Sequence, residues 1–217
     1  AENALCVESQ EFDEARTLIN ADIEDALQLM AKRIADYAEQ MKPSAIKWFP
    51  EKEDKQLGYR FTAIENIGAY VPGGLSGSTP LVSSVLMNLI PAKVAGVKNI
   101  VVATPPNKEG KIHPALLRAC EIAGATVVYK AGGAQGVAAM ALGTESCPQC
   151  VKIIGPGNAF VQEAKRQLFG LIDIDMMAGP SEIAIFADKS AKPHVLAADM
   201  LAQAEHDPLA ASVVISD

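Results

Sequence analysis

The pattern of apolar and polar positions divides the chain into a helical start and a longer alternating part. Apolar side chains first recur every three or four residues, as on one face of a helix. This spacing predicts a short helix with Ser9 as its candidate cap, and then a long amphipathic helix from Asn20 to Lys42 and Pro43. After a charged connector at residues 51–56, short β-branched runs alternate with helical stretches. This alternation is typical of an α/β protein.

Six runs have the length and composition of strands. They are residues 67–71, 99–103, 126–129, 151–154, 183–187 and 212–216. The helical patterns between them cover residues 83–95, 114–123, 135–142, 159–169 and 192–205. Because successive strand–helix–strand units form right-handed parallel crossovers, we expect a mainly parallel, Rossmann-like sheet with helices on both faces. Pro91 lies inside the first of these helical patterns and predicts a kink or an early end.

Irregular loops follow the first four predicted strands, and they contain Gly73, Pro105, Gly132 and Gly155. Since parallel strands end at the same edge of a sheet, we expect these loops to form a cleft there. Glycine at such a turn lets the backbone approach a phosphate, and the next helix N-terminus favours negative charge. No GxGxxG fingerprint is present, so tight turns that need glycine explain the same pattern as well as dinucleotide binding does.

Composition narrows the class of protein. The chain has 217 residues, of which 49% are hydrophobic and 21% are charged, as in globular proteins. Apolar runs are too short to cross a membrane, and the start is acidic where a secretory signal is basic, so we expect a cytoplasmic protein. A net charge of −7 without a basic run argues against nucleic acid or membrane partners and favours small molecules and protein chains.

The cysteines and two of the histidines give weak chemical signals. Cys147 and Cys150 form a CPQC run, which is either a metal or redox pair or a loop with two reduced thiols. His113 and His194 each neighbour a proline at a helix start, where capping or exposure is the ordinary role.

A stronger signal lies in the run LAQAEHDPLA near the end of the chain. Gln203 and His206 are three residues apart there, so on a helix they share a face. Metal ligation by this pair and stabilisation of a helix C-terminus by the imidazole both fit the spacing. Upstream, Ser181 and Glu182 precede a predicted strand, where they either face the cleft or shape a turn.

Several motifs, taken in order, resemble the histidinol dehydrogenase family. They are YVPGG (70–74), GGAQ (132–135), GTES (143–146), GPGNAFV.EAKRQ (155–167), AGPSE (178–182) and QAEH (203–206). The resemblance runs from Phe61 to the end, and more loosely through the helical start. It implies NAD-dependent, zinc-assisted oxidation of L-histidinol to L-histidine through histidinal, in the last steps of histidine biosynthesis.

The resemblance also implies roles for single residues. The positions that match NAD contacts are Tyr70, Gln135 and Asn158. The positions that match substrate contacts are Ser181, Gln203 and His206, of which Gln203 and His206 also match two zinc ligands. The implied cofactors are therefore NAD and zinc, the implied substrate is a small amino alcohol, and the implied assembly is a homodimer.

The resemblance is partial. The family takes its acid–base Glu–His pair and its remaining zinc ligands from a region beyond residue 217, and it has a further N-terminal segment. No catalytic residue is therefore assigned, and we expect the chain alone to be an incomplete and inactive piece. The loop at residues 73–84 is longer than expected, which leaves a related dehydrogenase of another small alcohol, such as a sulfonated diol, as an alternative. A noncatalytic α/β scaffold is the other alternative.

The same resemblance suggests how the chain is divided. Residues 1–69 are expected to form the helical segment and first strand of a discontinuous second lobe. Residues 70–181 are expected to form the NAD-binding Rossmann-like lobe, and residues 182–217 return to the second lobe with the zinc and substrate residues.

Overall fold

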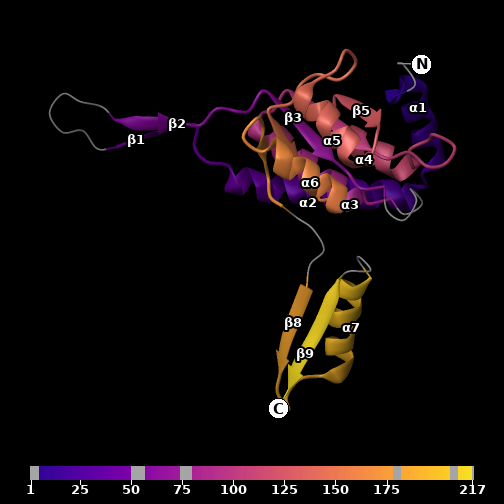
Figure 1. The fold of residues 1–217 in the computed structure, drawn as a ribbon, viewed down its shortest axis with the longest axis vertical. Helices are drawn as coiled ribbons and strands as arrows, with labels where there is room; N and C mark the ends of the chain where they lie inside the picture. The colour runs from indigo at the N-terminus through magenta and orange to yellow at the C-terminus, as the bar shows by residue number, and fades with distance from the viewer. Residues whose placement is uncertain (1–4, 50–56, 74–79, 178–181, 206–209, 217) are drawn as a thin grey trace. The chain divides into compact units, whose positions relative to one another are not determined.

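The computed structural model describes residues 5–49, 57–73, 80–177, 182–205 and 210–216. The chain divides into two compact units, Ala1–Met177 and Ala178–Asp217, which Figure 1 draws from indigo to yellow along the chain. Each unit is described by itself. No helix in the described ranges is long and apolar enough to cross a membrane.

A five-stranded parallel sheet organises the first unit (Figure 1). Its strands are β3 (Asn66–Tyr70), β4 (Asn99–Thr104), β5 (Val127–Lys130), β6 (Lys152–Ile154) and β7 (Asp173–Ile174). They lie in the order β5-β4-β3-β6-β7, with every neighbouring pair parallel. The chain thus starts in the middle of the sheet, builds to one side, and then crosses back to the other side of β3. This reversal creates a topological switch point between β3 and β6, where doubly wound α/β folds bind ligands.

Helices cover both faces of this sheet. The helices that share a core with one face are α1 (Ser9–Leu18), α2 (Ala21–Met41), α3 (Val82–Ala95) and α4 (Pro114–Ala123). The helices that share a core with the opposite face are α5 (Gly133–Leu142) and α6 (Ala159–Leu168). Along β4, Ile100 and Val102 pack into the first core, whereas Val101 and Ala103 pack into the second. This alternation confirms the predicted α/β class with helices on both faces.

Local signals explain where the N-terminal helices begin. Asn20 caps α2, because its side-chain oxygen accepts a hydrogen bond from the backbone nitrogen of Ile23 at 2.9 Å. The prediction that Ser9 caps α1 is wrong, since Ser9 is the first helical residue and Glu8 is the N-cap. The backbone nitrogen of Glu8 donates to the carboxylate of Glu11 at 3.0 Å, as in a capping box.

The predicted early end of the helix at Pro91 is also wrong, because α3 continues to Ala95. A proline inside a helix removes a single backbone hydrogen bond, whereas the side chains of Leu86 and Leu89 are fully buried and hold α3 in the core. The helix ends where Gly96 adopts a left-handed conformation with a φ of 91°.

Three short strands were not predicted. Strands β1 (Ile46–Trp48) and β2 (Gly58–Arg60) pair antiparallel, and the connector predicted at residues 51–56 lies outside the described residues. Strand β7 adds a short parallel edge to the main sheet.

The second unit holds the last three elements of the chain. They are β8 (Glu182–Ala187), α7 (Pro193–Ala204) and β9 (Ala211–Ser216). The two strands pair in parallel, as a strand–helix–strand unit requires. Among the described residues of this unit no side chain is fully buried.

Candidate functional site

Loops from three strands meet at the carboxyl edge of the main sheet. They follow β3, β4 and β5, and Pro105 in the middle loop contacts both neighbours. A Cβ atom on Gly73 would lie 2.6 Å from Cγ of Pro105, and one on Gly132 would lie 2.6 Å from Cβ of Pro105. The predicted gathering of loops at one edge is therefore confirmed for these three.

Tyr70 and Gly155 form the switch point between β3 and β6. Gly155 has a φ of 107°, and a Cβ atom there would lie 2.1 Å from the carbonyl oxygen of Tyr70. A glycine is required, because no side chain fits between the loop after β6 and the end of β3. The ring of Tyr70 is buried, and its hydroxyl accepts a hydrogen bond from the backbone nitrogen of Gly133 at 3.1 Å. Tyr70 therefore links the loop after β6 to the start of α5.

Gln135 and Asn158 stand at the starts of the two helices that leave this edge. Gln135 is exposed in the first turn of α5, and Asn158 is the N-cap of α6. The side-chain oxygen of Asn158 accepts a hydrogen bond from the backbone nitrogen of Val161 at 3.1 Å. This cap uses only the oxygen of the amide, so its N–H groups can donate to another partner. The N-termini of both helices offer backbone N–H groups and a positive dipole end, which suit a phosphate.

The three residues matched to NAD contacts thus lie along one edge of one sheet. Tyr70 is the last residue of β3, while Gln135 and Asn158 follow β5 and β6. Glycine at these turns and the two helix starts suit a dinucleotide. The contact of each residue with NAD stays a prediction.

A buried lysine, Lys165, contacts the loop after β6 at the same edge of the sheet. The apolar pattern of the sequence does not reveal it. Lys165 on α6 is 0% exposed, and its ammonium donates to the carbonyl oxygens of Gly155 at 2.8 Å and Met176 at 3.1 Å. Its third donor reaches Oδ1 of Asp175 at 2.5 Å, and Oδ2 of Asp175 accepts from the backbone nitrogen of Gly155 at 2.7 Å. Lys165 follows Val161 by four residues and lies on the same buried face of α6.

Only one of the residues matched to substrate and zinc can be placed. Gln203 is half-buried in the last turn of α7, while Ser181 and His206 lie outside the described residues. Because α7 ends at Ala204, the shared helix face of Gln203 and His206 stays a prediction. In the parts of the chain that the structure describes, no group of three His, Cys, Asp or Glu side chains is arranged to hold a metal ion.

The CPQC run forms a loop with two buried free thiols, while Pro148 and Gln149 between them are exposed. Cys147 and Cys150 are 4% and 0% exposed, and both thiols lie near the carbonyl oxygen of Pro148, at 3.8 and 3.7 Å. Burial raises the pKa of Cys147, and it raises the pKa of Cys150 to about 12. Both thiols therefore stay protonated at neutral pH, which favours the interpretation as a reduced loop over a redox pair.

The two histidines at helix starts have the ordinary roles that their positions predict. His113 is the N-cap of α4, and its Nδ1 accepts a hydrogen bond from the backbone nitrogen of Ala115 at 3.1 Å. Burial lowers the pKa of His113, which keeps this nitrogen available as an acceptor. His194 is exposed near the start of α7.

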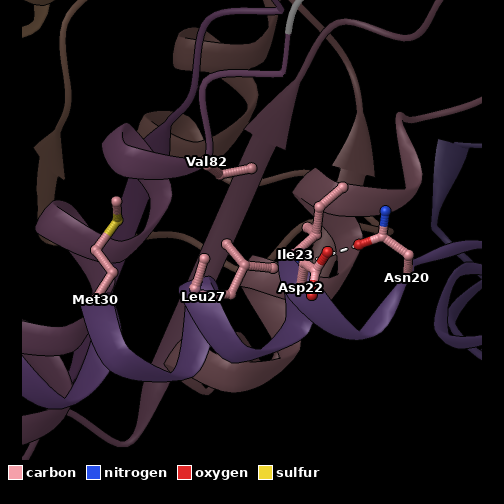
Figure 2. Close-up of a pocket in the computed structure, with 7 residues that line it drawn as sticks. Asn20, Asp22, Ile23, Leu27, Met30 and Val82 are labelled. Carbon is pink, nitrogen blue, oxygen red and sulfur yellow. Dashed lines mark hydrogen bonds between the residues drawn. The ribbon is translucent and has the colours of Figure 1, made fainter.

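A small apolar pocket lies apart from these residues. Figure 2 shows Ile23, Leu27 and Met30 of α2 around it, with Val82 from the start of α3. Its volume is about 260 Å³, and Asn20 and Asp22 close one end. None of its described lining residues matches a predicted site position. The glycine-bearing sheet edge is therefore the better candidate site.

Comparisons with known proteins show the family of the chain. The family model described as histidinol dehydrogenase matches residues 1–217. A histidinol dehydrogenase of Agrobacterium fabrum is 50% identical over 215 residues, which cover 99% of this chain and 48% of that protein. One from Desulfotalea psychrophila is 48% identical over 215 residues, covering 99% of this chain and 49% of that protein.

A solved structure gives the same result for the fold. The crystal structure of histidinol dehydrogenase from Elizabethkingia anophelis matches with a TM-score of 0.90 and 39% sequence identity. The match covers 98% of this chain and 48% of that chain. The chain thus spans about half of the length of the relatives it matches.

Proposed function

The chain belongs to the histidinol dehydrogenase family, and from this premise we propose that it forms the NAD-binding part of an enzyme that oxidises L-histidinol to L-histidine. The observation that carries the proposal is the switch point, where Tyr70 contacts the loop after β6 and the start of α5. Ligands of doubly wound folds bind at this place.

In this proposal the sheet edge holds the cofactor. NAD, when bound, accepts hydride from the carbon that carries the alcohol. Tyr70 and Asn158 flank the switch point, and Gln135 borders it from the start of α5. The starts of α5 and α6 would stabilise the negative charge of the pyrophosphate through their backbone N–H groups. The role of this part of the chain is to bind and orient the cofactor.

We assign the substrate and zinc contacts to the second unit. Zinc, when bound, supplies a Lewis acid that polarises the substrate oxygen. Gln203 and His206 would be two of its ligands, and Ser181 would donate a hydrogen bond to the amino alcohol. A second lobe that includes residues 182–217, a homodimer and a cytoplasmic location complete the proposal. Residues 1–69 are left with the first unit, because helices α1 and α2 share a core with the main sheet and β3 is its central strand.

The proposal is tested by titrating the full chain with NAD and comparing two tyrosine variants. Tyr70→Phe removes the acceptor that fixes Gly133, so we expect the dissociation constant for NAD to rise about fivefold, as for one lost hydrogen bond. Tyr129→Phe is the matched control, because Tyr129 is buried in the same core and its hydroxyl donates to the carbonyl of Ser146. We expect this control to change the affinity less than about twofold.

Two results would contradict the proposal. Equal affinities in Tyr70→Phe and the unchanged protein would remove Tyr70 from the cofactor site. A chain that binds neither NAD nor zinc would favour the noncatalytic scaffold. Titration with other small alcohols, including a sulfonated diol, separates histidinol oxidation from the related dehydrogenase reaction.

A further inference from the structure

We propose that Lys165 is a positioning residue that fixes the NAD-binding edge through Gly155, an inference that rests on the proposed function. Its ammonium is fully buried, and all three of its donors are used within a small part of the fold. The partners are the carbonyl oxygens of Gly155 and Met176 and the carboxylate of Asp175. These contacts hold Gly155, the first residue of the loop that follows β6. We call Lys165 and Asp175 together the clamp.

The clamp holds both polar groups of the Gly155 backbone. Lys165 binds the carbonyl oxygen of Gly155, and Asp175 accepts from its backbone nitrogen at 2.7 Å. The same loop runs on to Asn158, whose side chain caps α6. The position of Asn158 relative to the switch point therefore depends on how firmly Gly155 is held.

Stability of the core alone does not account for a lysine at this position. A buried ion pair costs desolvation of both groups, and well-packed apolar residues in its place are often as stable or more so. An apolar side chain at position 165 would continue the buried face that Val161 begins. It would leave the Gly155 carbonyl without this donor. The lysine therefore serves to fix the position of the Gly155 loop rather than to stabilise the folded protein.

The clamp also reaches the segment that leads to the second unit. Met176 precedes Met177, the last residue of the first unit, and the AGPSE run follows directly. Ser181 in that run matches a substrate contact. One ammonium therefore fixes the cofactor loop and the start of the segment that carries the proposed substrate residue.

A second Lys–Asp pair in the same sheet provides a matched control. Lys152 on β6 binds Asp173 on β7 at 2.6 Å, and the two side chains are 26% and 56% exposed. This pair joins β6 to β7, while Gly155 and Asp175 lie directly after these two strands, and the pair makes no contact with Gly155 among the described interactions. Lys152→Met removes an equal charge and leaves the loop untouched.

The test uses the full chain with two measurements on the variants Lys165→Met, Lys165→Met/Asp175→Leu and Lys152→Met. The first measurement is amide hydrogen exchange at Gly155 without NAD, and the second is the dissociation constant for NAD. We expect exchange at Gly155 to be at least about tenfold faster in Lys165→Met, and NAD binding to be at least about tenfold weaker in both Lys165 variants. In Lys152→Met, the exchange rate at Gly155 and the dissociation constant for NAD should both stay within about twofold of the unchanged protein.

The double variant separates positioning from stability in the NAD measurement, because it removes both buried charges and leaves an apolar pair. It also removes the acceptor of the Gly155 amide, so exchange at Gly155 is judged in Lys165→Met alone. Unchanged exchange at Gly155 in Lys165→Met, or unchanged NAD affinity in the double variant, would overturn the role of Lys165. The role of Lys165 would also be overturned if Lys152→Met changed Gly155 exchange and NAD affinity as much as Lys165→Met does. If exchange changes as expected but the unchanged chain binds no NAD, the clamp stands and the proposed function fails.

Discussion

Gly155 has a φ of 107°, and a Cβ atom there would lie 2.1 Å from the carbonyl oxygen of Tyr70. Gly155→Ala therefore combines a strained backbone with a clash against another strand. We expect it to lower the free energy of unfolding by at least about 3 kcal/mol, as measured by urea denaturation.

The control for this substitution is Gly110→Ala. Gly110 also has a positive φ, 75°, but a Cβ atom there would meet nothing within 4 Å. We expect a loss of about 1 kcal/mol, which reports the backbone strain alone. Equal losses at the two positions would show that the loop after β6 yields to the added carbon.

Some of the residues at the site can be predicted from the sequence, and others cannot. The turns at Gly73, Gly132 and Gly155 are predicted from glycine at the ends of strands, and the structure places them at one edge. The sequence does not predict a buried Lys165, because a lysine in a helix ordinarily lies at the surface. Its partner Asp175 follows β7, a strand of two residues. No local sequence pattern indicates that the side chains of Lys165 and Asp175 form an ion pair.

At the scale of elements, the predicted strands and helices of the main sheet agree with the structure to within a few residues. Helix α4 begins and ends at the predicted residues, because Pro114 opens it and Gly124 closes it. Strands β1, β2 and β7 were missed, because two or three residues are too few to show an alternation. The strand order was not predicted, since it depends on pairing between distant segments.

An ion pair between two helices makes the stability of the first unit depend on pH. Arg118 on α4 donates to both carboxylate oxygens of Glu24 on α2, at 2.8 and 2.7 Å. Chiefly these hydrogen bonds hold the pKa of Glu24 at about 2, below its ordinary 4.5. Because the folded state lowers this pKa, the stabilisation is fully present above pH 4.5 and is lost as pH falls toward 2.

Glu24→Gln should therefore lower the free energy of unfolding by about 1 kcal/mol at neutral pH. The difference from the unchanged protein should shrink below pH 4.5 and vanish near pH 2, in urea denaturation at a series of pH values. Glu39→Gln is the control, because Glu39 lies exposed on the same helix without an ion pair in the described part of the chain. A difference that stays constant down to pH 2 would show that the charge of Glu24 does not matter.

At the scale of the whole molecule, the two units differ in how much apolar surface they bury. Val101 and Val102 of β4 are 0% exposed, whereas Phe186 of β8 is 79% exposed. Regions with few buried contacts open at low free-energy cost. We expect backbone amides of β8 and β9 to exchange at least about a hundredfold faster than those of β4. Hydrogen exchange followed by mass spectrometry measures this, and equal protection of the three strands would contradict it.

The strand order also governs how the chain assembles as it leaves the ribosome. β3, β4 and β5 emerge first and form one side of the sheet, while the other side of β3 waits until β6 has been synthesised. An unpaired strand edge exposes backbone N–H and C=O groups that can pair with other chains. Between the synthesis of β5 and that of β6, we therefore expect this side of β3 to be open to pairing with other chains.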